Sequence, residues 1–291
     1  MRRKVDKVLS STAMKEKKKL LRSPLRYPGG KQRAIKEIAK HLPEHAREYR
    51  EPMVGGGSVY FHLRQRAFAE TYWINDKFTD LVEFWRASQD EGQCLRLRKE
   101  LHALKSELTS AEAMKDYFQR TRKLTPEDPF EKALLFFFFN RVTFSGTTKA
   151  GGFSTEASKK RFTYSSIERL TAMPAALAGV KITNLDVESV ISEPGDDVFI
   201  FLDPPYYRAE RLYGKDGSLH RFDHARLAQV LKETGHRFLI TYDDCEEIRQ
   251  LYKWARIESW RLQYGMNNCN KDKTSKIGDE ILVCNYDTVS G

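Results

Sequence analysis

The segment Asp203–Tyr206 places an acid before two prolines and an aromatic residue, directly after the apolar run Val198–Leu202. Such a run predicts a buried parallel strand, and ligands of open α/β sheets bind at the carboxyl ends of strands. Because proline fixes φ and lacks an N–H donor, the segment predicts a stiff pocket wall with a carboxylate, a carbonyl acceptor and a flat ring. It suits a planar substrate with an exocyclic amino group. A proline-capped strand end with a solvated acid is the alternative.

Two segments nearer the N-terminus contain glycines that let a backbone approach a ligand closely. Arg26–Lys31 is predicted to be a loop that leads into a helix, although a tight turn with a solvated lysine is the alternative. Glu51–Ser58 is predicted to be a glycine turn between a strand near Tyr49 and a helix. That order is the first unit of a nucleotide-binding half-sheet, but the glycine spacing is not the dinucleotide fingerprint. The acid Glu51 suits a ligand with a cationic amine.

The rest of the chain alternates strands with helices, which predicts an α/β fold with a mainly parallel sheet and helices on both faces. The second strand, Thr71–Asp76, ends in an acid about 20 residues beyond the glycine turn, where it can bind ribose hydroxyls or cap the next helix. Later strands are predicted at 180–186, 197–203, 236–242, 256–264 and 279–286, and helices at 223–234 and 244–253.

Residues 90–165 have a different pattern, with helices predicted at 91–108, 111–123 and 128–140. The last of these contains four consecutive phenylalanines, so it must be buried on several sides. A polar, glycine-rich stretch, Phe144–Phe153, follows it and precedes the basic cluster Lys159–Arg161. A long functional loop is the favoured interpretation of this stretch.

The net charge of +10 favours polyanionic partners. Residues 1–22 contain nine lysines and arginines against two acids, so the rest of the chain is only mildly basic. This basic arm could track a phosphate backbone, but a disordered leader is favoured because the arm lacks aromatic residues. The four scattered cysteines predict reduced thiols in a cytoplasmic protein, without metal-ligand spacing. No apolar stretch approaches the length of a membrane span.

Taken together, the motifs resemble the Dam-type, D12-class (alpha group) N6-adenine-specific DNA methyltransferases over about residues 24–287. The resemblance implies a Rossmann-like methyltransferase sheet with helices on both faces and an inserted, mainly helical target-recognition domain. It implies S-adenosylmethionine as cofactor, S-adenosylhomocysteine as product, no metal, and double-stranded DNA as partner. The expected divisions are a basic arm at 1–23, a catalytic domain at 24–89 and 166–291, and the insertion at 90–165.

The resemblance also implies site residues. Catalysis is expected from Asp203, Pro204, Pro205 and Tyr206. Cofactor binding is expected from Tyr27, Gly30, Lys31, Glu51, Gly55, Gly57, Ser58, Asp76, Asp186 and Asp203. DNA binding is expected from Asn140, Arg141, Ser145, Lys149, Arg208, Arg211, Lys271 and Lys273.

In this reading, Asp203 and the carbonyl of Pro204 would accept the two hydrogens of adenine N6 and aim its lone pair at the sulfonium methyl. Positioning and acceptor placement would carry most of the rate, and the base must be flipped out of the duplex. Relatives that read GATC have Asn and Arg where this chain has Ser145 and Lys149. Since lysine reads guanine less well than arginine, a different or relaxed target is expected, with Lys149 as the leading reader.

Other functions remain open at this stage. An RNA adenine methyltransferase could use the same catalytic segment, and a non-catalytic sequence-specific DNA-binding module could keep the fold. Cytosine N4 is chemically similar to adenine N6, although that branch tends to begin its segment with serine. The expected source is a bacterium, an archaeon or a phage, with a restriction-modification context among the options. The oligomeric state is left open, with a monomer as one possibility.

Overall fold

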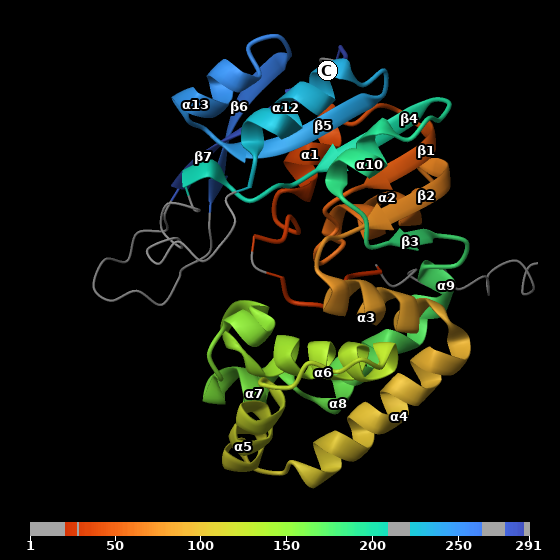
Figure 1. Ribbon diagram of the computed structural model, residues 1–291, viewed down its shortest axis with the longest axis vertical. Coiled ribbons are helices and arrows are strands. Elements are labelled where there is room, and N and C mark those ends of the chain that lie inside the picture. The colour runs from red at the N-terminus through yellow and green to blue at the C-terminus, as the bar shows by residue number, and fades with distance from the viewer. Residues whose placement is uncertain (1–20, 28, 209–221, 264–276, 288–291) are drawn as a thin grey trace, which may run out of the picture.

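The computed structural model describes residues 21–27, 29–208, 222–263 and 277–287 (Figure 1). Seven strands form one sheet in the order β3-β2-β1-β4-β5-β7-β6. Strands β1 to β5 pair in parallel, and β7 runs antiparallel between β5 and β6. The strands are β1 (Ala46–Glu51), β2 (Ala69–Asn75), β3 (Lys181–Thr183), β4 (Val198–Leu202), β5 (Arg237–Asp243), β6 (Arg256–Gln263) and β7 (Ile277–Cys284). The predicted Rossmann-like α/β architecture is confirmed.

The order of the strands reverses between β1 and β4. The chain moves from β1 outward to β2 and β3, then returns to β4 on the other side of β1. Loops at the carboxyl ends of β1 and β4 therefore leave the sheet side by side, and this is where open α/β sheets bind ligands. Glu51 ends β1, and Asp203 directly follows β4.

Alternating side chains of β4 explain why its whole run is apolar. Phe199 and Phe201 pack into the cluster on one face of the sheet, while Ile200 and Leu202 pack into the cluster on the other. Helices α1 (Ile35–His41), α2 (Ser58–Gln65) and α3 (Thr79–Gln89) contribute to the first cluster, and α10 (Val187–Ser192), α12 (His224–Glu233) and α13 (Glu246–Leu251) to the second. Both faces of the sheet are thus covered (Figure 1).

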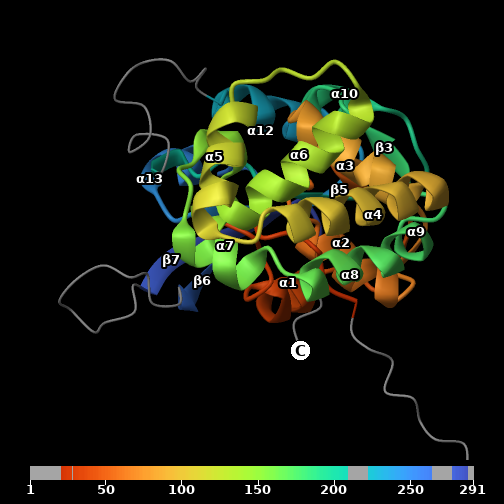
Figure 2. The same ribbon diagram turned by 90° about the horizontal axis from the view of Figure 1, so that it is seen from below.

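The inserted helices form a layer at one end of the sheet (Figure 1), and they lie in front of the sheet when the molecule is seen from below (Figure 2). They are α4 (Glu91–Glu107), α5 (Ala111–Thr121), α6 (Pro129–Val142), η1 (Phe144–Gly146), η2 (Thr148–Ala150), α7 (Thr155–Arg161), α8 (Tyr164–Glu168), η3 (Arg169–Ala172) and α9 (Met173–Ala176). The helical segment therefore continues past 165, where the sequence pattern predicted the catalytic part to resume. The short turns α8 to α9 lack a readable helical period, but Leu170 and Met173 are buried in the same cluster as α4.

The four consecutive phenylalanines of α6, Phe136–Phe139, are at most 1% exposed. Phe136 and Phe137 contact Phe84 of α3, with ring centroids 5.5 and 5.8 Å away. Phe138 lies 5.0 Å from Tyr117 of α5, on another side of the helix. The prediction that α6 is buried on several sides is confirmed, and its C-terminal end is consequently a rigid base for the turn that follows.

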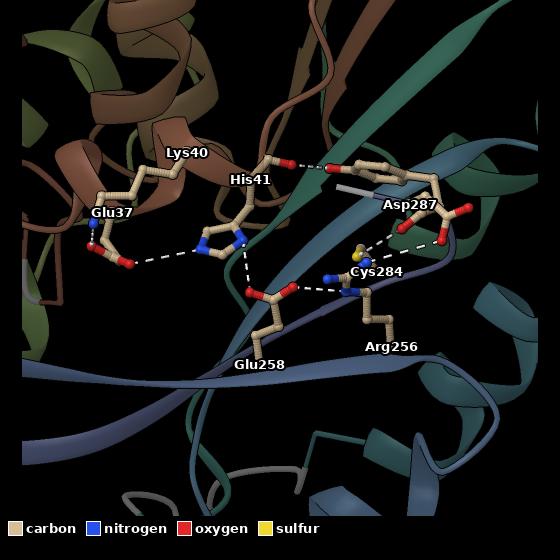
Figure 3. Close-up of polar contacts among 8 residues, drawn as sticks. Glu37, Lys40, His41, Arg256, Glu258, Cys284 and Asp287 are labelled. Atoms are coloured by element: carbon tan, nitrogen blue, oxygen red, sulfur yellow. Dashed lines mark hydrogen bonds and ion pairs between the residues drawn. The ribbon is translucent and has the colours of Figure 1, made fainter. Parts of the chain in front are cut away.

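Helix α1 is pinned to the far edge of the sheet by a polar network around His41 (Figure 3). His41 Nδ1 lies 3.1 Å from Glu258 Oε2, and Nε2 lies 3.7 Å from Glu37 Oε1. Glu258 in turn accepts from Arg256 Nε at 2.7 Å. The hydroxyl of Tyr286 donates to the backbone carbonyl of His41 at 2.7 Å. This network therefore anchors the C-terminal end of α1, the helix that follows Lys31.

Candidate functional site

Asp203 is held by two side chains from different parts of the chain. Lys31 Nζ lies 2.6 Å from Asp203 Oδ1, and the hydroxyl of Thr241 on β5 donates to the same oxygen at 2.8 Å. No hydrogen bond from any described residue reaches Oδ2. The side chain of Asp203 is 22% exposed, whereas that of Lys31 is 6% exposed. One carboxylate oxygen is thus anchored, and the other is available to an incoming hydrogen-bond donor.

The residues after Asp203 form a supported wall. Pro204 is buried and Pro205 is exposed. Lys31 Nζ lies 4.8 Å from the ring centroid of Tyr206, so the lysine contacts both the acid and the ring. Asp243, at the end of β5, accepts the backbone N–H groups of Tyr207 and Arg208 at 2.9 and 3.1 Å. Arg208 itself is exposed.

Glu51 is a buried carboxylate at the switch point. It is 3% exposed, and the hydroxyl of Tyr49 donates to Oε2 at 2.6 Å. Burial raises the pKa of Glu51 to about 8, and the nearby carboxylates of Asp203 and Asp76 add to the rise. These three acids therefore lie close enough to repel one another, which predisposes the site to a cation.

The glycine turn after β1 lies against the Arg26–Lys31 loop. A Cβ at Gly55 would come 2.7 Å from Tyr27 Cε1, and one at Gly30 would come 3.1 Å from the Tyr27 carbonyl. Gly55 and Gly57 have φ of 46° and 68°, a region that favours glycine. Ser58 begins α2 directly after this turn. The structure thus brings the two predicted glycine segments together.

Asp76 lies beside the same turn. Its Oδ2 accepts the Gly55 N–H at 2.9 Å and its Oδ1 accepts the Phe78 N–H at 3.0 Å. Burial raises the pKa of Asp76, while these backbone donors oppose the rise. The neighbouring Asn75 joins three strand ends, because it donates to the carbonyls of Pro52 and Leu185 at 2.9 and 3.1 Å.

Asp186 lies further along this edge. It caps α10 by accepting the Glu188 N–H at 3.1 Å, and Lys77 Nζ lies 3.4 Å from its Oδ2. Asp186 is therefore a helix cap, and its side chain is exposed. Two exposed apolar side chains, Phe78 and Leu185, occupy the same loops at 36% and 42% exposure.

The placement of Asn140 requires a correction to its predicted contact with DNA. The side chain is 0% exposed. Its Nδ2 donates to the carbonyls of Arg26 at 2.5 Å and Gly146 at 3.3 Å, and its Oδ1 accepts the Arg26 N–H at 3.1 Å. Both of its N–H bonds are used inside the chain, so none remains for a base. Asn140 holds the Arg26–Lys31 loop instead.

Lys149 makes two polar contacts within the chain. Its Nζ lies 3.3 Å from Asp80 Oδ2 on α3 and donates to the carbonyl of Leu124 at 3.2 Å. The ammonium group therefore ties the turn after α6 to the sheet layer, and the role of Lys149 in reading bases stays a prediction. Ser145 lies in a turn at φ 52° and is partly exposed.

Arg141 lies close to three other arginines. It is 3% exposed, and its Nε and Nη2 have no hydrogen-bond partner among the described residues. Burial lowers the pKa of Arg141, and the charges of Arg169, Arg26 and Arg161 lower it further. Arg211, Lys271 and Lys273 lie outside the described residues.

Sequence reasoning missed several residues of this region. The contacts of Thr241 with Asp203 and of Tyr49 with Glu51 could not be predicted. Hydroxyl side chains are common in strands, and their partners depend on the register of the sheet. Phe144 could have been noticed, since an apolar residue opens the polar stretch. It is 66% exposed, the highest value for a large apolar side chain in the described part of the chain. The described residues also contain no long apolar helix of membrane-spanning kind and no cluster of candidate metal ligands.

The sequence of this chain is similar to those of known DNA methyltransferases. Residues 27–266 match the family described as D12 class N6 adenine-specific DNA methyltransferase. A DNA N-6-adenine-methyltransferase of Escherichia phage P1 is 30% identical over 79% of this chain, although the match spans only 31% of that protein. A DNA adenine methylase of Vibrio cholerae is 27% identical over 90% of this chain and 95% of its own length. The type II methyltransferase M.MjaIII of Methanocaldococcus jannaschii is 26% identical over 90% of this chain and 98% of its own.

The matched residues include the Glu51–Ser58 turn, the inserted helices and the Asp203–Tyr206 segment. The chain therefore belongs to the D12 class N6 adenine-specific DNA methyltransferases.

Proposed function

We propose that the protein transfers a methyl group from S-adenosylmethionine to N6 of an adenine flipped out of double-stranded DNA. The geometry of Asp203 carries this proposal. Its Oδ1 is anchored by Lys31 and Thr241, so Oδ2 and the Pro204 carbonyl can accept the two hydrogens of N6. The N6–methyl bond forms as the methyl–sulfur bond breaks, and one N6 proton leaves through Asp203 to solvent. S-adenosylhomocysteine is the other product.

Glu51, Asp76 and the Gly55 turn would hold the cofactor. Bound there, S-adenosylmethionine would supply an activated methyl group. Its amino group suits the buried carboxylate of Glu51, which forms no ion pair with the described residues. The remaining lone pairs of Asp76 suit ribose hydroxyls, while its backbone bonds to Gly55 and Phe78 fix its orientation. Exposed Phe78 and Leu185 suit an adenine ring, with Asp186 near its amino edge.

The arginine group supports DNA as the substrate. Arg161 and Arg169 are exposed, and the uncompensated Arg141 lies beneath them. Guanidinium groups bind phosphate well because their planar donors match its oxygens. We assign this surface to the phosphate backbone of the duplex, with Arg141 reinforcing its positive charge.

Phe144 supports base flipping. It projects from the turn at the rigid end of α6, and the next residue, Ser145, has a strained positive φ of 52°. Proteins that distort duplexes insert apolar side chains between base steps, at a cost of a few kcal/mol of unstacking. We assign Phe144 the role of such a wedge. No observation specifically favours RNA or a non-catalytic module.

Asp203→Asn is expected to lower methyl transfer to DNA by about 10²- to 10⁴-fold, because it removes the proton acceptor. Cofactor binding should persist, since the amide keeps the shape of the side chain. Transfer of labelled methyl to plasmid DNA measures the first quantity and calorimetry the second. Asp196→Asn, at an exposed position, is the control. Near-normal turnover of Asp203→Asn would remove the acid from the mechanism.

Cofactor affinity is expected to increase as pH rises through about 8, because burial favours protonated Glu51 in the free protein and an amine requires the ionised form. Binding near neutral pH should release about one proton. The raised pKa of Glu51 also makes the stability of the free protein depend on pH. Its contribution to the free energy of unfolding is fully present below pH 4.5 and is lost as pH rises through about 8.

Calorimetry in buffers of different ionisation enthalpy measures the protons released. Glu51→Gln should abolish the release and weaken binding, whereas Glu70→Gln, the same change at an exposed position of β2, should leave both unchanged. Unaltered proton release in Glu51→Gln would assign the cofactor's amine to another residue.

Arg161→Met is expected to weaken DNA binding equally at every sequence and to reduce the salt slope of the binding constant by about one. Titration of labelled duplexes at several salt concentrations measures both effects. Arg96→Met, on the exposed side of α4, is the control outside the arginine group. A sequence-dependent loss would instead make Arg161 a reader of bases.

Phe144→Ala is expected to reduce the flipped fraction of the target base and the rate of methylation, while binding of the cofactor stays unchanged. The target is first located by sequencing a plasmid expressed with the enzyme. A duplex with 2-aminopurine at that adenine then reports flipping by its fluorescence. Leu95→Ala removes another exposed apolar side chain of the insert and should have no effect. Equal fluorescence in Phe144→Ala and the unmodified protein would exclude the wedge.

A further inference from the structure

The main chain of Arg26 is gripped by a single side chain from a distant helix. Asn140 accepts from its N–H and donates to its carbonyl, across 114 positions of sequence. The Asn140 amide thus satisfies both the N–H and the carbonyl of Arg26, as a neighbouring strand would do in a sheet. Because the amide is 0% exposed, solvent does not compete for it, and the two segments are joined firmly.

On one side, the segment after Arg26 connects Asn140 to the proposed cofactor and catalytic residues. Tyr27 follows and lies against Gly55 of the cofactor turn. The Tyr27 carbonyl accepts the Gly30 N–H at 3.1 Å, which folds the loop back on itself. Lys31 then reaches Asp203 at 2.6 Å. A displacement of the main chain at Arg26 would thus change both the cofactor pocket and the orientation of the catalytic acid.

On the other side, Asn140 is connected to the turn after α6, which belongs to the proposed DNA surface. The third bond of Asn140 goes to the Gly146 carbonyl at 3.3 Å. A Cβ at Gly146 would come 2.2 Å from the Arg26 carbonyl, so the turn and the loop are in direct contact. The same turn carries the exposed Phe144.

We propose that Asn140 is a positioning residue that couples DNA bound at the insert to the cofactor site through the Arg26–Lys31 loop. This inference rests on the function proposed above. Duplex that fixes the Phe144 turn would also fix the loop, so cofactor would bind more tightly to the DNA complex than to the free protein. By linkage, cofactor must tighten DNA binding by the same factor.

The coupling is measured as the ratio of the dissociation constants for S-adenosylhomocysteine without and with target duplex, using the product so that no turnover occurs. The unmodified protein should show a ratio of about 5 to 150, the usual range for coupled sites. In Asn140→Leu, which has a similar volume and no amide, the ratio should fall close to one. The kcat should fall with it, while binding of duplex alone changes less than about twofold.

Thr143→Val is the matched control. Thr143 is also buried at the end of α6, and its hydroxyl bonds Phe139 and Thr148 rather than Arg26. A merely structural role of Asn140 predicts that both variants lose stability and that both keep the ratio. Thermal unfolding of each variant separates this outcome from a change in coupling.

A second measurement needs no substitution. In the unmodified protein, duplex without cofactor should slow hydrogen exchange at the amides of Arg26 and Gly30. A ratio of one in the unmodified protein, or unchanged exchange at these amides, would overturn the coupling while leaving the proposed function intact. Failure of S-adenosylhomocysteine to bind under either condition would instead overturn the proposed function, and the coupling with it.

Discussion

Three carboxylates meet at the carboxyl edge of this sheet, and their mutual repulsion shapes the site. Glu51, Asp76 and Asp203 come from β1, β2 and β4, which lie next to one another because the strand order reverses. The protein offsets the repulsion in three ways: a raised pKa of Glu51, backbone donors to Asp76, and Lys31 beside Asp203. Each leaves part of the acid's binding capacity for a ligand. The loops around this edge therefore stabilise the three acids in the free protein.

The inserted helices contribute rigidity rather than surface alone. The phenylalanines of α6 contact aromatic rings of both α3 and α5, so the helix cannot rotate or slide without breaking several aromatic contacts at once. Dense apolar packing of this kind behaves as a solid body rather than a fluid one. Small shifts at the turn after α6 would thus be transmitted to the Arg26–Lys31 loop and not absorbed within the helix.

Much of this architecture follows from local sequence. The apolar run before Asp203 and the glycines after Glu51 placed both acids at strand ends, because strand and turn propensities depend on near neighbours. The roles of Asn140 and Lys149 could not be predicted in the same way. Their partners, Arg26 and Asp80, are distant in sequence, and only the packing of α6 against the sheet layer decides whether a polar side chain points to DNA or inward. The short helices from α8 to α9 could not be predicted for a related reason, since they are too short to show a helical period.

Both margins of the sheet resist pairing with a further strand. At one margin, β3 is only three residues long, and Lys181 lies 3.4 Å above the Trp73 ring. At the other, β6 carries Arg256 and Glu258, which are joined by an ion pair. Short strands and charges are the means by which natural sheets avoid edge-to-edge aggregation. A continuous intermolecular sheet is consequently disfavoured, and the protein can approach a long polymer such as DNA in many copies without polymerising itself.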